Sequence, residues 1–204
     1  NNKKLIGFAA YSGTGKTTLI KSIVTILKEL NYRVSVIKHA HHNFDIDKPE
    51  KDSYEIRKSG AENMLISSQK RWALVHENIN NDELNLSELI NILDNKDNDI
   101  ILVEGFKAEK FPKIELYRKQ VSKSFLYDND ESIIAIAHDE NIEINADIKK
   151  LDINNPQEIA KYIIEYLGIG KKSWYLRYIH KYGNIDFLAK YISYAKNIIW
   201  KNNI

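Results

Sequence analysis

The sequence of 204 residues contains no cysteine, only three prolines and only eight glycines. Without cysteine, disulfide bonds, thiolate metal sites and cysteine nucleophiles are excluded. So few prolines and glycines leave little room for long flexible linkers. With 43% hydrophobic and 28% charged residues, the composition predicts a folded chain, large enough for one well-buried domain plus an appendage.

Long hydrophobic runs are also lacking. No apolar run approaches the roughly 20 residues that are needed to span a bilayer. The apolar stretch after the basic start at Lys3 and Lys4 ends at Ser12 and Gly13, which is too short for a signal peptide. We therefore expect a soluble, cytoplasmic protein without a membrane span, and the lack of cysteine fits that location.

Acidic residues are scarce in the last segment, where Asp186 is the only acid after Gly168. Seven basic residues share that segment: Lys171, Lys172, Arg177, Lys181, Lys190, Lys196 and Lys201. Aromatic and aliphatic residues recur there at helical spacing, which predicts a basic, aromatic-rich helical extension over 168–204 beside a main domain over 1–167. Such an extension could dock on a partner, an anionic lipid or nucleic acid, but packing is favoured because Tyr and Trp stripes are normally buried. We expect no nucleic-acid partner.

The main domain begins with a strand, a helix and a second strand. Residues 5–10 are apolar, residues 17–30 have helical spacing, and residues 33–37 alternate. This βαβ order implies a parallel sheet. Further strands are predicted at 64–66, 72–75, 99–104, 113–117 and 133–137, and further helices at 52–58, 84–93 and 156–168. The pattern predicts a three-layer α/β P-loop NTPase domain with a mostly parallel sheet.

A phosphate cradle follows the first strand. The segment from Ala10 to Thr17 matches the Walker A pattern, with Ala10 in place of the usual first glycine. Small residues let backbone N–H groups turn toward phosphate oxygens, and the next helix adds its positive end. Lys16 would reach the β and γ phosphates, and the Thr17 hydroxyl would bind Mg²⁺. The predicted nucleotide-binding residues are Ser12, Gly13, Thr14, Gly15, Lys16, Thr17 and Thr18.

A second acid is expected at the end of a neighbouring strand. Glu104 ends the apolar run 100–103, and we predict that it joins Thr17 in the Mg²⁺ shell and Lys16 in catalysis. The sequence has no evident group that positions an attacking water, and the guanine-reading Asn/Thr-Lys-x-Asp pattern is missing. The residues therefore support nucleotide binding more firmly than hydrolysis, and do not choose GTP over ATP.

A histidine-rich loop follows the second predicted strand, from Lys38 to Pro49. Since ligands bind at the carboxyl ends of parallel strands, this loop should face the cradle. Three interpretations remain open: an anion site, a transition-metal site of imidazole and carboxylate ligands, or a solvated polar loop. The candidate anion or cofactor ligands are Lys38, His39, His41, His42, Lys48, Arg57 and Arg71. Asp45 could also complete the Mg²⁺ shell.

These motifs resemble the molybdopterin-guanine dinucleotide biosynthesis adaptor (MobB) family over about residues 3–167. The resemblance is carried by residues 8–18, by the histidine loop, by residues 68–74 and by the run from Leu102 to Lys107. It implies binding of GTP and Mg²⁺, at most a weak GTPase activity, and a homodimer. It also implies that the protein assists a guanylyltransferase in attaching GMP to molybdopterin, with molybdopterin or its guanine dinucleotide as a second ligand.

Two other functions remain open from the sequence. One is a P-loop kinase that acts on a small anionic substrate, with the histidine loop as the acceptor site. The other is a metallochaperone GTPase that uses His39, His41 and His42.

Overall fold

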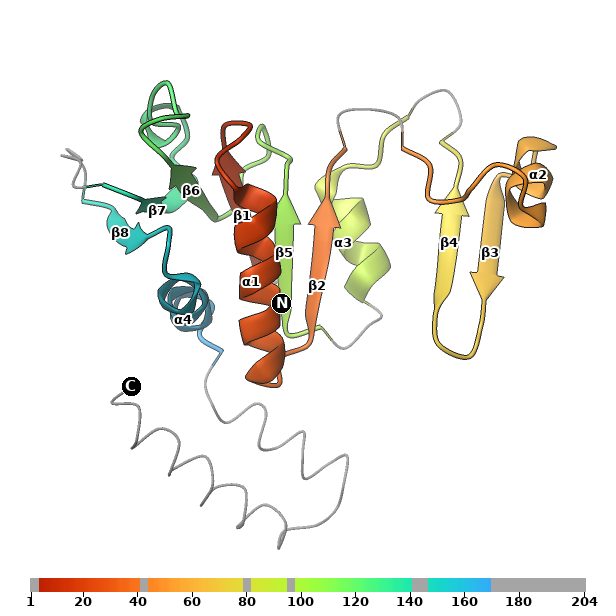
Figure 1. Cartoon of the computed structure of the whole chain (residues 1–204), viewed down its shortest axis with the longest axis horizontal. Coiled ribbons are helices and arrows are strands. Elements are labelled where there is room, and N and C mark those ends of the chain that lie inside the picture. Colours follow the sequence, from red (N-terminus) through yellow and green to blue (C-terminus); the bar gives the residue numbers. More distant parts are fainter. Residues whose placement is uncertain (1–3, 41–43, 79–81, 95–97, 141–146, 170–204) are drawn as a thin grey trace, which may run out of the picture.

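The computed structural model describes residues 4–40, 44–78, 82–94, 98–140 and 147–169 (Figure 1). His41, His42 and nearly all of the predicted extension 168–204 lie outside these residues, so those expectations stay predictions. Within the described residues, no helix is long and apolar enough to cross a bilayer.

A six-stranded parallel sheet forms the centre of the domain, in the order β2-β5-β1-β6-β7-β8. Its strands are β1 (Leu5–Ala10), β2 (Val34–Lys38), β5 (Ile100–Glu104), β6 (Lys113–Tyr117), β7 (Ile133–His138) and β8 (Lys149–Asp152). The register pairs Phe8 of β1 with Glu104 of β5, and Ala10 with Leu116 of β6. Because all six strands are parallel, their carboxyl ends share one edge of the sheet, and the Walker A segment leaves β1 at that edge.

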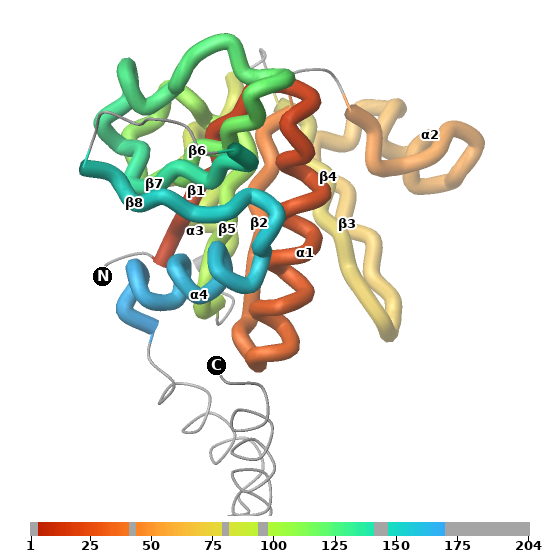
Figure 2. The backbone as a smooth tube through the Cα atoms, turned by 60° about the vertical axis from the view of Figure 1, so that its left-hand side comes forward, coloured from red at the N-terminus to blue at the C-terminus, as the bar shows by residue number. Residues whose placement is uncertain are grey.

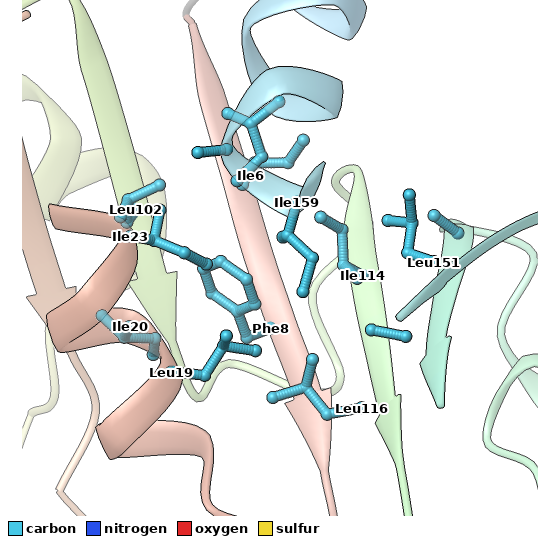
Figure 3. Packing of buried hydrophobic residues seen from close by; sticks show 14 of the residues in the cluster. Ile6, Phe8, Leu19, Ile20, Ile23, Leu102, Ile114, Leu116, Leu151 and Ile159 are labelled. Atoms are coloured by element: carbon cyan, nitrogen blue, oxygen red, sulfur yellow. The ribbon is translucent and has the colours of Figure 1, made fainter. Parts of the chain in front are cut away.

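Helices cover both faces of the sheet, which confirms the predicted three-layer α/β architecture (Figure 2). Helices α1 (Lys16–Glu29) and α4 (Pro156–Tyr166) pack on one face, and α3 (Leu86–Asp94) packs on the other. The larger core lies under α1 and α4, where Phe8 meets Ile23 and Ile159 (Figure 3). Alternate residues of β5 divide between the two cores, as expected for a strand buried on both faces.

A β-hairpin stands apart from the central sheet, on the side of β2 (Figure 1). It consists of β3 (Asn63–Ser67) and β4 (Trp72–His76), preceded by helix α2 (Asp52–Lys58). Leu65 is paired with Leu74 across the hairpin. One face of the hairpin carries Leu65, Leu74 and Trp72, and each of these side chains is about half exposed. The hairpin is therefore a separate two-stranded sheet with an uncovered apolar face.

The connection from β6 to β7 is anchored by a buried carboxylate. Glu115 of β6 is fully buried and accepts hydrogen bonds from the backbone N–H groups of Leu126 and Tyr127, at 2.8 and 3.0 Å. The short 3₁₀ helix η2 (Tyr127–Asn129) begins there. Burial raises the pKa of Glu115, and the two N–H donors oppose that effect. This anchor fixes a loop that reaches back over the Walker A segment.

Candidate functional site

The Walker A loop has the backbone that the sequence predicts. Gly13 and Gly15 have φ angles of +86° and +89°, in the left-handed region that favours glycine. Helix α1 begins at Lys16, so the N–H groups of its first turn lie at the carboxyl edge of the sheet, where they suit an anion. Thr14 differs from its neighbours because it is buried and its hydroxyl donates to the Tyr11 carbonyl at 2.8 Å. Its side chain therefore stabilises the loop, while the side chains of Ser12, Thr17 and Thr18 are on the open side.

Three groups surround the Glu104 carboxylate at the end of β5. Its Oε1 lies 3.8 Å from Lys16 Nζ and 3.4 Å from Thr17 Oγ1, while its Oε2 lies 3.8 Å from Lys38 Nζ. Burial lowers the pKa of Lys16, and so do the neighbouring ammonium groups of Lys107 and Lys38, whereas Glu104 opposes the shift. The structure thus brings together Lys16, Thr17 and Glu104, three of the four residues predicted for terminal phosphates and Mg²⁺, and Lys38 lies beside them.

The oxygen donors of Thr17 and Glu104 fit Mg²⁺. This ion typically takes one or two protein oxygens and completes its octahedral shell with phosphate oxygens and water. Among the described residues, no group of three or more His, Asp or Glu side chains is placed to hold a metal ion. A resident transition-metal site is therefore not formed by that part of the chain, and the predicted roles of His41 and His42 as metal ligands stay untested.

A cavity of about 450 Å³ lies over these groups. Its volume is in the usual range for a small-molecule site. It is lined by Ala10, Ser12, Lys16, Lys38, His39, Ala40, Phe44, Glu104, Gly105 and Lys107. Five predicted site residues, from the cradle, the histidine loop and β5, therefore meet around one space.

His39 also lines a second cavity, of about 400 Å³. Its ring stacks on Phe106 with centroids 4.7 Å apart, and its Nε2 lies 2.6 Å from Glu83 Oε1. The backbone N–H of His39 donates to the Glu104 carbonyl at 2.8 Å. His39 and Lys107 line both cavities, so the first residues of the histidine loop join them. Phe106 lies within the run from Leu102 to Lys107 that carries the resemblance, but neither Phe106 nor Glu83 was predicted as a site residue.

Two predicted ligands pair with each other instead of lining the cavity. Arg57 is buried, and its two terminal nitrogens donate to Asp45 and to Glu77. These ion pairs connect the histidine loop to α2 and to the residue after β4, so the predicted roles of Asp45 at Mg²⁺ and of Arg57 at an anion stay predictions. Neither residue lines a cavity described above.

Two other predicted cations also lie away from the cavity. Lys48 is exposed on the loop and is absent from the residues that line either cavity. Arg71 lies in the turn between β3 and β4, where its backbone bonds to Ser68, at the end of the hairpin opposite the Walker A edge (Figure 1). Within this chain, the structure does not bring Lys48 or Arg71 to the Walker A loop.

A second set of side chains, none of them predicted, reaches the Walker A loop from the other side. Arg118 follows β6, and its Nε donates to the Thr14 carbonyl at 3.2 Å. Its terminal nitrogens donate to Asp139 Oδ2 at 3.1 Å and to Asn154 Oδ1 at 3.0 Å. The Tyr11 hydroxyl lies 2.9 Å from Ser124 Oγ of the same loop. No local motif marks these residues, because they come from three separate strand ends.

Comparisons with known proteins agree on one family. The family model described as "MobB: Molybdopterin guanine dinucleotide synthesis protein B" matches residues 5–139. The chain is 43% identical over 164 residues to the "Molybdopterin-guanine dinucleotide biosynthesis adapter protein" of Escherichia coli, which covers 80% of this chain and 93% of that protein. It is 38% identical over 167 residues to the protein of the same name from Haemophilus influenzae, covering 82% of this chain and 91% of that protein.

A solved structure has the same fold. The crystal structure of a "MobB protein homolog from Bacillus stearothermophilus" superposes with a TM-score of 0.62 and 18% sequence identity. The match covers 82% of this chain and 99% of that one. At this identity the likeness concerns the fold, and the function rests on other observations.

Proposed function

The chain belongs to the MobB family, and we propose that it is a GTP-binding adaptor in the synthesis of molybdopterin guanine dinucleotide. The curated relatives carry the name of adapter proteins for that synthesis. One structural observation supports nucleotide binding most directly. The Glu104 carboxylate lies beside both Lys16 and Thr17 at the mouth of the Walker A loop, under a cavity that can hold a polyphosphate.

In this proposal the ligands are GTP and Mg²⁺, and each site residue has a defined task. Backbone N–H groups of residues 13–18 bind the phosphates, and Lys16 balances their negative charge. Thr17 and Glu104 hold Mg²⁺, which would neutralise charge between the β and γ phosphates. Any hydrolysis would be slow, because the sequence offers no evident group to position water. The protein would act in the cytoplasm by presenting GTP to a guanylyltransferase.

We also propose a second ligand beside the nucleotide, namely molybdopterin or its guanine dinucleotide. The second cavity supports this assignment because Lys107 and His39 line both cavities, and because Phe106 and Asn85 add an aromatic ring and an amide. A planar ring system with a phosphate matches such a lining.

The proposed adaptor is a homodimer. The hairpin supports this state, since Leu65, Leu74 and Trp72 form an exposed apolar face on a sheet of only two strands. Two-stranded sheets are marginally stable alone, and exposed apolar patches usually mark contact sites. A second copy of the chain would cover this face.

Calorimetric titration with GTP, ATP and a non-hydrolysable GTP analogue tests the function. We expect GTP and its analogue to bind alike, with Lys16→Ala weakening both by about 100-fold, since a buried charge-assisted contact to phosphate is lost. Lys161→Ala is the control, because Lys161 is exposed and forms an ion pair with Glu165 along α4. A preference for ATP, or rapid phosphoryl transfer to a small acceptor, would contradict the adaptor function and favour a kinase.

A further inference from the structure

The Walker A loop has a second flank that the phosphate and Mg²⁺ ligands leave unused. Glu104 and Lys38 lie on the side of β5 and β2, whereas β6, β7 and β8 lie on the other side of β1. Mg²⁺ and the terminal phosphates belong with Glu104. The nucleoside of a triphosphate held by this loop would then extend away from β5, across the carboxyl ends of β6 to β8. Arg118, Asp139 and Asn154 lie at those ends.

Arg118 fixes the distance between the Walker A loop and the side chains of Asp139 and Asn154. One guanidinium donates to the Thr14 carbonyl, to Asp139 and to Asn154, at 3.2, 3.1 and 3.0 Å. Asp139 and Asn154 are therefore separated from the Walker A backbone by the width of a single guanidinium group. They are close enough to meet the base of a nucleotide whose phosphates lie in the loop.

The hydrogen bonds with Arg118 also determine which polar groups of Asp139 and Asn154 remain available to a ligand. Asp139 uses Oδ2 for Arg118, while its Oδ1 is enclosed and has no hydrogen-bond partner among the described residues. An enclosed carboxylate oxygen without a donor is costly, so a donor is expected there in the complex. Asn154 turns its amide oxygen to Arg118, so its NH₂ group faces elsewhere as a donor. Asn154 is exposed and the Asp139 side chain is one-fifth exposed, so a base edge can approach the pair, and Oδ1 meets that edge once the carboxylate turns toward it.

We propose that Asp139 reads the guanine base through its N1–H and 2-amino groups, while the Asn154 amide donates to guanine O6. Guanine presents two donors and one acceptor along that edge, which match a carboxylate and an amide NH₂. Adenine presents an acceptor at N1 and a donor at N6, so both contacts would be mismatched. A site whose polar groups are left unpaired by the wrong ligand discriminates strongly. Arg118 acts as a positioning residue that aligns both readers with the loop.

This inference rests on the proposed GTP function and names the residues that select the base. Calorimetry with GTP, ATP, inosine triphosphate and xanthosine triphosphate tests it, using the full chain and Mg²⁺. The wild type should bind GTP at least 100-fold more tightly than ATP, and inosine triphosphate about 10-fold more weakly than GTP, because inosine lacks the 2-amino donor.

The variant Asp139→Asn should reverse the preference. Asparagine keeps an oxygen for Arg118 but offers NH₂ where the carboxylate accepted, and xanthine carries an acceptor oxygen at C2. GTP affinity should therefore fall about 10- to 100-fold, and xanthosine triphosphate should become the tighter ligand. Glu140→Gln is the matched control, since Glu140 pairs with Lys119 at 3.0 Å and should not affect selectivity.

The outcomes separate this inference from the function beneath it. If Asp139→Asn still prefers GTP, or gains no affinity for xanthosine triphosphate, the assignment of Asp139 is overturned. The proposed GTP function would still stand in that case, provided that Lys16→Ala loses GTP binding. If the wild type prefers ATP, both are overturned. Should Asp139→Asn fail to fold, Asn154→Asp decides, because a carboxylate facing O6 must weaken GTP at an unchanged melting temperature. Unchanged GTP affinity in that variant overturns the proposal.

Discussion

Gly105 packs so closely on His39 that a Cβ atom added to Gly105 would lie 2.5 Å from the Cβ of His39. Gly105 has a φ angle of +104°, and the next residue, Phe106, has +53°, which is unusual for a bulky side chain. This turn follows directly on Glu104, and its tight contact brings the start of the histidine loop onto that strand end. Both cavities are shaped by the contact, since His39 lines each of them.

The first prediction compares Gly105 with Gly60, a second glycine that has a similar positive φ angle. Gly60 has a φ angle of +110°, but a Cβ atom there would meet nothing within 4 Å. Gly60→Ala should cost about 1–2 kcal/mol of unfolding free energy from backbone strain alone. Gly105→Ala should cost at least about 1 kcal/mol more, because His39 must move. Urea unfolding measures the difference, and equal losses in the two variants would show that the contact is unimportant.

A second prediction concerns the carboxylate at the end of β5. Glu104→Gln removes a charge that lies near Lys16, Lys38 and Thr17. Binding of GTP with Mg²⁺ should weaken about 10-fold or more, because a neutral amide is a poor ligand for Mg²⁺. Binding without Mg²⁺ should hold or improve, since a negative charge beside the phosphates is lost. Titrations with Mg²⁺ and with EDTA test this, with Glu165→Gln on the exposed face of α4 as the control. Equal weakening in both titrations would assign Glu104 a role other than holding Mg²⁺.

The parts of the site that lie within one short segment could be predicted from the sequence. The strand, glycine turn and helix around Lys16 are local, and their pattern specifies both the backbone and the position of the positive helix end. Glu104 could be placed as well, because an apolar run that ends in an acid marks a buried parallel strand and its carboxyl end. The three-layer fold followed from the same hydrophobic periods.

The parts that depend on distant contacts could not be predicted. Arg118 meets Thr14, which is 104 residues earlier in the chain, and its three acceptors come from separate loops. Arg57 looked like an anion ligand because its charge is visible in the sequence, whereas its partners Asp45 and Glu77 are set by the packing of the loop and the hairpin. Strand β8 was also missed, since Lys149 and Lys150 give this short edge strand little hydrophobic signal.

A third prediction follows from the buried Glu115. Burial raises its pKa in the folded state above the usual value near 4.5, so the folded protein binds this proton more tightly than the unfolded chain. The contribution of Glu115 to stability is therefore greatest below about pH 4.5 and is lost as the pH rises through the raised pKa. Each tenfold difference in proton affinity corresponds to about 1.4 kcal/mol.

Urea unfolding of the wild type and Glu115→Gln between pH 4 and 7.5 tests this sign. The amide cannot ionise, so the loss of stability caused by the substitution should be largest at low pH and should shrink as the pH rises. Glu165→Gln is the control, because it removes a carboxylate that lies on the exposed face of α4 and pairs with Lys161, away from Glu115. A loss that grows with pH would mean that the two backbone N–H donors outweigh burial and lower the pKa.

The fourth prediction concerns the uncovered face of the hairpin. Leu65 and Leu74 face each other across β3 and β4 and are 60% and 49% exposed, which is unusual for paired leucines. In a homodimer that buries this face, each would contribute up to about 1.5–3 kcal/mol, and a charge there would have to be desolvated without a partner. Leu65→Glu combined with Leu74→Glu should therefore raise the dimer dissociation constant at least about 100-fold.

Light scattering during size-exclusion chromatography should then give the monomer mass. Ile92→Glu is the matched control, because Ile92 is 55% exposed on α3 and is not part of the hairpin, and this variant should remain dimeric. Since the hairpin lies apart from the Walker A loop, the double variant should bind GTP as the wild type does. A dimer that survives the double substitution would place the subunit contact elsewhere and leave the apolar face for a different protein.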